Sequence, residues 1–223
     1  MRRKDILSTG GVYHVFNKSI ANFKIFNNEI EFLRMTHAVK YYQISKPQVC
    51  FARFMEHEEV AARGFYSAFA SSEQQKEKLV EIIAFCLMPS HLHLILKQMK
   101  ENGISLFMSN LLNSYARYFN LKHGRKGPLW EGRFKNVLIE RDEYLLHLTR
   151  YLHLNPVTSY LVDYPEQWRH SSFLEFLSKT SGQEAICQFN DILSIEPISY
   201  KKFVEDRISY QRELAKIKDL ILE

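Results

Sequence analysis

The chain has 223 residues, 46% of them hydrophobic and 25% charged, which is enough for a substantial folded domain and too apolar for a disordered protein. No apolar run approaches the roughly 18 residues that a membrane span requires, and no apolar segment follows the basic N-terminus, so we expect neither a membrane helix nor a secretory signal. The formal net charge of +5 is a modest excess, so the distribution of the basic residues matters more than their number.

The first third of the chain predicts a strand, a helix and a less regular segment. Residues 10–19, "GGVYHVFNKS", follow a Gly-Gly turn signal and predict a strand. Apolar residues at helical spacing then predict a helix that begins after Asn28 as N-cap and is stopped by Lys46-Pro47. Residues 47–78 follow no clear period, and we expect an excursion of mixed helix and loop.

The next elements are more sharply patterned. "LVEIIAFCLMP" predicts a buried strand, a Pro-Ser pair predicts a tight turn, and "HLHLILKQ" predicts the antiparallel partner strand. "ISLFMSNLLNSYARYFNLKH" predicts an amphipathic helix ended by Gly124, and "FKNVLIE" predicts a fourth strand. Asp142 is expected to cap a further helix, which Asn155-Pro156 should end.

This order of elements predicts an α+β fold with a ferredoxin-like β-α-β-β-α-β antiparallel sheet and one added helix. We expect residues 1–160 to form one catalytic domain that includes the excursion at about 47–78. Residues 161–223 are mostly helical in pattern and are expected to form a C-terminal helical extension packed on or near that domain.

Two histidines within the third predicted strand are the first candidate site. Residues i and i+2 of a strand share a face, so His91 and His93 point together while the leucines between and after them face the core. Such a pair can share a divalent metal if a third ligand is present. With nine histidines in the chain, one H-x-H triplet also arises readily by chance, and two unrelated histidines are the simpler alternative.

The predicted helix after Asp142 carries a second candidate pair. Tyr151 and Asn155 lie one helical turn apart on the same side, where a nucleophilic hydroxyl and an oxygen ligand could act together. The alternative is that Tyr151 is a core residue with its hydroxyl at the rim of the protein.

A basic segment, residues 121–135, is the candidate surface for nucleic acid. Glycines and aromatics are interleaved with its cations, as suits contact with phosphates and stacked bases. The candidate DNA-binding residues in this segment are Lys122, Arg125, Lys126, Trp130, Arg133 and Lys135. A solvated surface loop, with Trp130 as a hydrophobic plug beneath it, is the alternative.

Three ordered motifs carry a resemblance to a known family. "CLMPSHLHLILK", "GPLWEGRFKNVLI" and "YLLHLTRYLHLNPV" resemble, in order and spacing, the single-tyrosine HUH transposases, and most closely the REP-associated tyrosine transposases. The resemblance covers about residues 10–160, and "DYPEQWRHSSF" extends it.

The resemblance implies a role for each candidate residue. His91, His93 and Asn155 would hold a divalent metal, Mg²⁺ or Mn²⁺, and Tyr151 would be the nucleophile. Tyr144, which lies on the same helical stripe as Tyr151, is a reserve nucleophile by its position alone. Arg150 would join the basic segment in binding DNA. The implied enzyme is a DNA nickase and strand transferase that cuts single-stranded DNA near hairpins or palindromic repeats through a 5′-phosphotyrosine intermediate.

The resemblance also implies the setting in which the protein works. We expect a bacterial cytoplasmic protein whose partner is single-stranded or hairpin DNA rather than a membrane, and a monomer rather than a homodimer. Three cysteines without a C-x-x-C pair fit reduced thiols in that compartment. Two alternatives stay open: a domesticated protein that binds hairpin DNA without cutting it, and a metal-dependent hydrolase that uses water as nucleophile.

Overall fold

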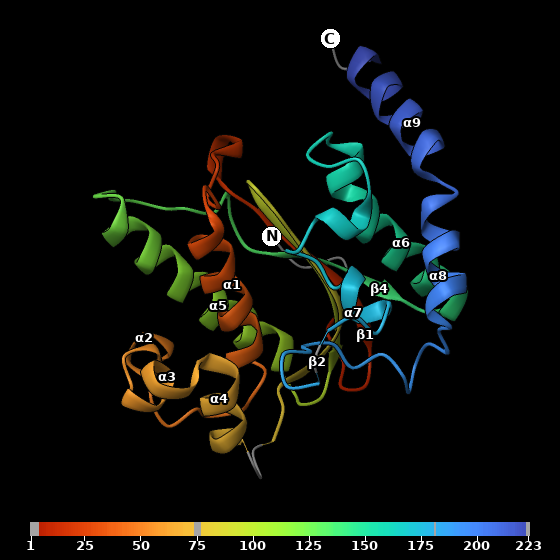
Figure 1. Cartoon of the computed structure of the whole chain (residues 1–223). Coiled ribbons are helices and arrows are strands. Elements are labelled where there is room, and N and C mark those ends of the chain that lie inside the picture. Colours follow the sequence, from red (N-terminus) through yellow and green to blue (C-terminus); the bar gives the residue numbers. More distant parts are fainter. Residues whose placement is uncertain (1–4, 74–76, 181, 222–223) are drawn as a thin grey trace.

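The computed structural model describes residues 5–73, 77–180 and 182–221 (Figure 1). Parts of three predicted features lie outside the described residues: the basic N-terminus at 1–4, the excursion at 74–76, and the C-terminal extension at 181 and 222–223. Within the described ranges, no helix combines the length and the apolar character that crossing a bilayer demands.

Four strands form one antiparallel sheet in the order β2-β3-β1-β4. They are β1 (Val12–Lys18), β2 (Val80–Met88), β3 (His91–Gln98) and β4 (Lys135–Ile139). Because β1 and β2 run parallel with β3 inserted between them, this is the strand order of a ferredoxin-like sheet. The predicted fold class is confirmed.

Helices surround this sheet. Those between the strands are α1 (Glu29–Tyr41), α2 (Phe51–Met55), α3 (Glu58–Arg63), α4 (Phe65–Glu73) and α5 (Gly103–Lys122), with a 3₁₀ turn at Ile20–Asn22. Those after β4 are α6 (Asp142–Thr158), α7 (Phe173–Phe176), α8 (Pro197–Glu205) and α9 (Ile208–Ile221), with a second 3₁₀ turn at Pro165–Gln167.

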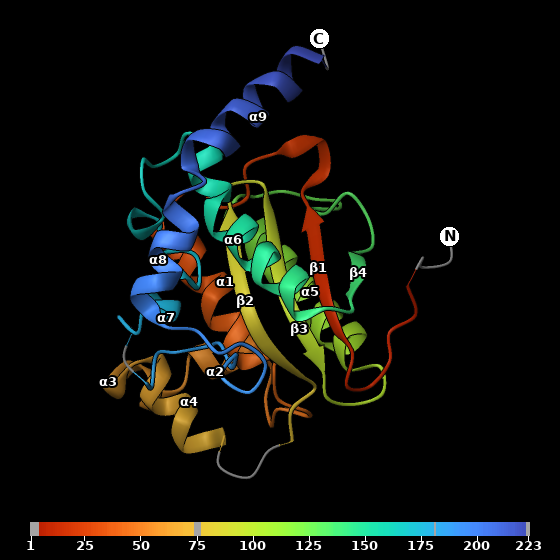
Figure 2. The same cartoon turned by 90° about the vertical axis from the view of Figure 1, so that its right-hand side faces the viewer.

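The two faces of the sheet carry separate cores. Figure 2 shows α6 crossing in front of the sheet, with α1 and α5 behind it. The alternation of β1 sends Tyr13 and Val15, both fully buried, toward α1 and α5. The opposite face of the sheet packs on α6, where Ile95 of β3 meets Leu148 and Leu152. The histidine pair shares this second face with Ile95, so the fold places it beside α6.

The first predicted helix has its expected start and an earlier end. The Asn28 side chain accepts a hydrogen bond from the Glu31 amide at 3.2 Å, which confirms the predicted N-cap. The helix ends at Tyr41, before the predicted stop at Lys46-Pro47. The reason is a competing pairing, because Ile44 forms a bridge with Lys78 and withdraws the intervening chain from the helix.

Both predicted boundaries of α6 were wrong. Arg141, not Asp142, is the N-cap, and no side chain caps the helix; Asp142 is its first residue. The helix also continues through Asn155 and Pro156 to Thr158. Proline removes one helical hydrogen bond, and burial of Pro156 and of Val157, which is 0% exposed, offsets that loss. The extra turn keeps Asn155 on the helix, directly below Tyr151.

The excursion builds an aromatic layer on α1. Phe51 and Phe54 of α2 and Phe69 of α4 all contact the Tyr41 ring, with centroid distances of 5.0–5.7 Å. These rings belong to the same core as α1 and α5. After α6, the C-terminal part of the chain packs on the other core, through Phe173 and Tyr200.

Candidate active site

The histidine pair lies side by side on β3. The rings of His91 and His93 stand 5.2 Å apart between centroids, at 89° to each other. Burial is the largest cause that lowers the pKa of each; nearby Lys18 adds to the effect at His91, and His14 and then His91 add to it at His93. Both imidazoles are therefore neutral near pH 7, the form that binds a metal.

His14 on β1 completes the buried face beside His93. Its Nε2 lies 2.9 Å from His93 Nδ1, so one nitrogen donates to the other. His14 is 8% exposed, and burial lowers its pKa to about 4. Phe16, two residues further along β1, stacks on His93 at 5.8 Å between centroids. His93 is thus held from the β1 side by a hydrogen bond and a ring contact.

Helix α6 brings the predicted tyrosine to the same place. The Tyr151 ring meets His93 edge-on, at 6.0 Å between centroids and 86°. Tyr151 is 45% exposed, and no such ring contact joins Tyr144 to the histidines in the described part of the chain. Burial raises the pKa of Tyr151, while the nearby Asn155 amide acts in the opposite direction. The phenol therefore faces the histidines and keeps its proton at neutral pH.

The candidate donor atoms are of types that divalent metals bind. His91 Nδ1 is near Ser90 Oγ at 3.2 Å and His93 Nδ1 is occupied by His14, which leaves the Nε2 atom of each ring for a ligand. Asn155 Nδ2 is buried with no hydrogen-bond partner among the described residues. Amide nitrogen and oxygen exchange places on a flip of the group, so this position can present an oxygen donor. The candidate ligands are therefore two imidazoles and one amide.

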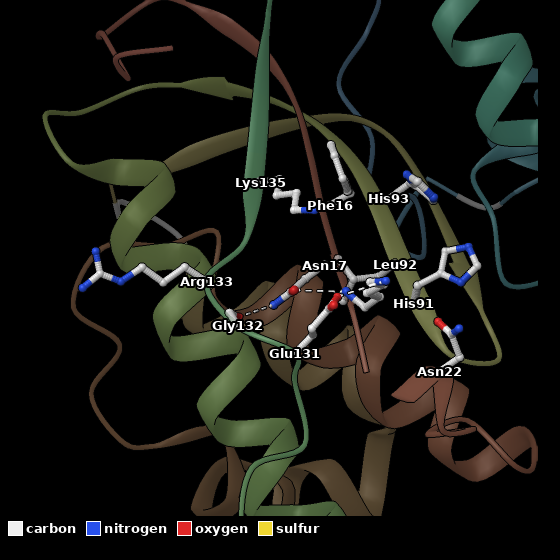
Figure 3. Close-up of a pocket in the computed structure, with 11 residues that line it drawn as sticks. Phe16, Asn17, Asn22, His91, Leu92, His93, Glu131, Gly132, Arg133 and Lys135 are labelled. Atoms are coloured by element: carbon white, nitrogen blue, oxygen red, sulfur yellow. Dashed lines mark hydrogen bonds and ion pairs between the residues drawn. The ribbon is translucent and has the colours of Figure 1, made fainter. Parts of the chain in front are cut away.

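A cavity of about 540 Å³ opens beside the histidines. It is walled by β1, β3 and the segment before β4, and Figure 3 shows the histidines on one side with Arg133 extending away from them on the other. Lys18, Arg133 and Lys135 are its cations, and Glu131 is its acid, paired with Lys18 at 3.1 Å. The excess of cations suits an anionic ligand such as a phosphate.

The structure divides the predicted DNA-binding residues into two groups. Arg133 and Lys135 line the histidine cavity, and Lys126 is exposed nearby in sequence. The others have partners within the protein, as follows: Lys122 bonds Glu31, Arg125 bonds Asn120, the Trp130 indole donates to the Leu112 carbonyl, and Arg150 lies 4.2 Å over the Phe203 ring. Half-buried Trp130 packs against the core, as expected for the plug that was its alternative interpretation.

Sequence reasoning missed the contribution of β1. His14, Phe16 and Lys18 alternate along "YHVFNK" and share the face of the histidine pair. The period-2 pattern was visible in the sequence, and His14 could have been grouped with the pair had the register of β1 on β3 been known.

The chain is similar in sequence and in fold to known proteins. Residues 57–155 match the model of a family described as "Transposase IS200 like". A curated protein of Haemophilus influenzae, provisionally named as a REP-associated tyrosine transposase, is 29% identical over 104 residues, which cover 42% of this chain and 58% of that protein. A solved structure of a REP-associated tyrosine transposase bound to a REP hairpin aligns with a TM-score of 0.53 at 16% identity, over 88% of this chain and 99% of that one. The sequence matches confirm the resemblance read from the motifs, and the structural match confirms the fold.

Proposed function

We propose that this chain, which matches the IS200-like transposases in sequence and shares the fold of a REP-associated tyrosine transposase, cleaves and rejoins single-stranded DNA next to hairpin-forming repeats. The observation that carries the proposal is the meeting of Tyr151 with His93, 6.0 Å between ring centroids, beside the Asn155 amide, which also acts on the Tyr151 phenol. A protein that only bound DNA would require neither the phenol nor the amide at that point.

The chemistry assigned to Tyr151 is an attack on a DNA phosphate. The Oη atom of Tyr151 forms a bond to phosphorus, the bond from phosphorus to the 3′ oxygen breaks, and that oxygen leaves as a 3′-hydroxyl after taking up a proton. Because burial raises the pKa of Tyr151, the phenol loses its own proton only as the new bond forms. The resulting 5′-phosphotyrosine stores the bond energy, so a second 3′-hydroxyl can reverse the step and join a new strand.

His91 and His93 through Nε2, with the Asn155 amide oxygen, would hold the Mg²⁺ or Mn²⁺ ion. When bound, that ion supplies positive charge against the phosphate oxygens in the transition state. All three ligands are neutral, so the charge of the ion is not cancelled by the protein. Imidazole donors suit Mn²⁺ better than Mg²⁺, which favours Mn²⁺ in this site.

The DNA substrate is assigned from charge and from the relatives. Arg133 and Lys135 give the cavity beside the histidines a phosphate-binding wall. The structurally similar transposase is bound to a REP hairpin, and we extend that class of DNA to this chain. Tyr151 reaches His93 within one chain, which supports a monomer as the active form.

The experiment that tests the proposal is capture of the covalent intermediate. The protein is incubated with Mn²⁺ and a labelled hairpin bearing single-stranded flanks from its own gene neighbourhood, then digested and analysed by mass spectrometry. We expect a nucleotide linked through phosphate to the peptide that contains Tyr151. Tight hairpin binding without any adduct would favour the non-cleaving alternative, and turnover without an adduct would favour a hydrolase.

His14 gives a further prediction at the same site. Nε2 of His93 can bind a metal only if Nδ1 carries the proton and donates to His14, so His14 fixes the required tautomer. We expect His14→Phe to weaken Mn²⁺ binding by about 10–100-fold, the usual effect of losing such a supporting contact. Electron paramagnetic resonance of free Mn²⁺ measures this without DNA. An unchanged affinity in the folded variant would exclude the role.

A further inference from the structure

Three cavities in the described part of the chain form a row, and each shares lining residues with the next. The cavity at the histidine pair shares Gly132 and Arg133 with a second of about 430 Å³. The second shares Asn113 with a third of about 890 Å³, which lies between α1, residues 47–56 and α5. The shared residues link the histidines to the excursion. Arg133 lines both of the first two cavities, and its side chain points away from the histidines (Figure 3).

The third cavity, which we name the α1–α5 groove, has a mixed apolar and polar lining in which two arginines face one carboxylate. Arg34 of α1 and Arg117 of α5 line it, and Glu56 is its acid. Asn110 and Asn113, both exposed, add amide groups on the α5 side. No salt bridge joins either arginine to a carboxylate among the described residues. The groove therefore offers two cations whose charge is not neutralised by a direct ion pair.

Arg34 is held in an unusual position for an arginine without a carboxylate partner. Its guanidinium carbon lies 4.4 Å from the Phe51 ring centroid and 5.0 Å from that of Tyr118. Burial is the largest cause that lowers its pKa, which reflects lost hydration of the charge. The two ring contacts fix the plane of the guanidinium. The rings do not accept hydrogen bonds from its N–H groups, which point outward within that plane. An anionic oxygen in the groove would restore those hydrogen bonds.

We propose that the α1–α5 groove binds the single-stranded DNA that continues from the hairpin held at the histidine pair. This inference rests on the proposed function and adds the course of the flanking strand. Phosphates of that strand would bond Arg34 and Arg117, and the two asparagines would contact sugars or base edges. The excursion forms one wall of the groove through residues 47–56, and it thereby gains a role in binding DNA.

The first test measures affinity by fluorescence anisotropy with three probes: a bare hairpin, and the same hairpin with a 5′ or a 3′ single-stranded extension. Arg117→Ala changes an exposed residue and should leave the fold intact. We expect Arg117→Ala and Arg34→Gln each to weaken binding of one extended probe by about 3–10-fold and to reduce its salt dependence by about one counterion, with the bare hairpin unaffected.

Arg63→Ala is the matched control, because Arg63 is an exposed arginine of α3 that does not line the groove. Thermal melting checks that Arg34→Gln keeps its fold; if it does not, Arg117→Ala carries the test alone. Unchanged affinity for both extended probes, or an equal loss on the bare hairpin, would overturn the proposal. In that case the groove would serve another ligand, such as an acidic peptide.

Cys50 allows a second, independent test. It lines the α1–α5 groove and is exposed, whereas Cys86 is buried and Cys187 is half-buried. DNA carrying a disulfide tether on a chosen phosphate should cross-link to Cys50 only from positions in the extension, and Cys50→Ser should abolish the product. Equal cross-linking from the stem or the hairpin loop would contradict the assigned path.

Neither the affinity measurement nor the cross-linking to Cys50 depends on DNA cleavage. The groove proposal and the proposed function can therefore be refuted separately. A DNA adduct at Tyr151 together with unchanged affinities in the arginine variants refutes the groove alone. Weakened binding of an extended probe without any adduct supports the groove and refutes the cleavage chemistry.

Discussion

Replacing Tyr151 by phenylalanine is expected to lower covalent capture of hairpin DNA by at least about a thousandfold, because the substitution removes the atom that attacks phosphorus. Affinity for the hairpin should stay within about threefold of the wild type, since the ring that contacts His93 is kept. Adduct formation is measured on a denaturing gel with labelled DNA and Mn²⁺, and affinity by anisotropy.

Tyr144→Phe is the matched control for this prediction. Tyr144 lies on the same helix, is 46% exposed against 45% for Tyr151, and is the reserve nucleophile named from the sequence. We expect this variant to form the adduct at the wild-type rate. Loss of the adduct in Tyr144→Phe with retention in Tyr151→Phe would reassign the nucleophile. Loss in both would point to a fault in α6 as a whole.

The fold is expected to lose stability steeply as the pH falls below about 6.5. Burial lowers the pKa of His14 and of His37 to about 4 and that of His153 to about 3, from an ordinary value of 6.5. His153 is fully buried between the Tyr200 hydroxyl at 2.7 Å and Ser172 Oγ at 2.8 Å. In each case the unfolded chain binds a proton that the folded chain resists.

The sign and size follow from proton linkage. Between pH 6.5 and about 4 the unfolded state binds more protons, so the free energy of unfolding falls as the pH falls, by about 1.4 kcal/mol per pH unit for each histidine. Three histidines give about 4 kcal/mol per unit near pH 5, against a typical total of about 5–15 kcal/mol. Glu31, whose pKa is lowered to about 2, adds to the loss below about pH 4.5. We expect acid unfolding between about pH 4 and 5.

Urea unfolding at a series of pH values measures how the free energy of unfolding changes per pH unit. The variant His37→Phe isolates the contribution of one histidine to this slope. His37 stacks on Phe65 at 4.1 Å between centroids, and its Nδ1 is buried without a partner among the described residues. Phenylalanine keeps the stacking and removes the titrating group, so the slope near pH 5 should fall by about 1.4 kcal/mol per unit. A wild-type slope near zero would show that protonating these histidines does not destabilise the folded protein.

One of the acid-sensitive histidines, His153, lies on the helix that carries Tyr151. His153 lies two residues beyond Tyr151 on α6, and its hydrogen bonds tie the inner side of that helix to Tyr200 of α8 and to Ser172. Ser172 in turn bonds the Phe85 backbone of β2. The same helix thus presents Tyr151 to the histidine pair on one side and is anchored by His153 on the other.

Elements with a local cause could be predicted from the amino-acid sequence alone. A continuous apolar run defines β2 and the turn after it makes a hairpin with β3, where a strand's period of two puts His91 and His93 on one face. In the same way, helical spacing predicted that Tyr151 and Asn155 lie on the same side of α6. The order of these elements was sufficient to predict the ferredoxin-like sheet, because few other chain paths satisfy short connections and paired strands.

Which of these residues come into contact depends on long-range packing, which local pattern does not reveal. The contact of His14 with His93 depends on the register of β1 on β3, and that register joins segments far apart in the chain. The continuation of α6 past Pro156, which keeps Asn155 below Tyr151, depends on the core that buries Val157. The α1–α5 groove requires the excursion to pack across two helices. Local pattern selects helices and strands, whereas long-range packing sets the distances between their side chains, and those distances define the site.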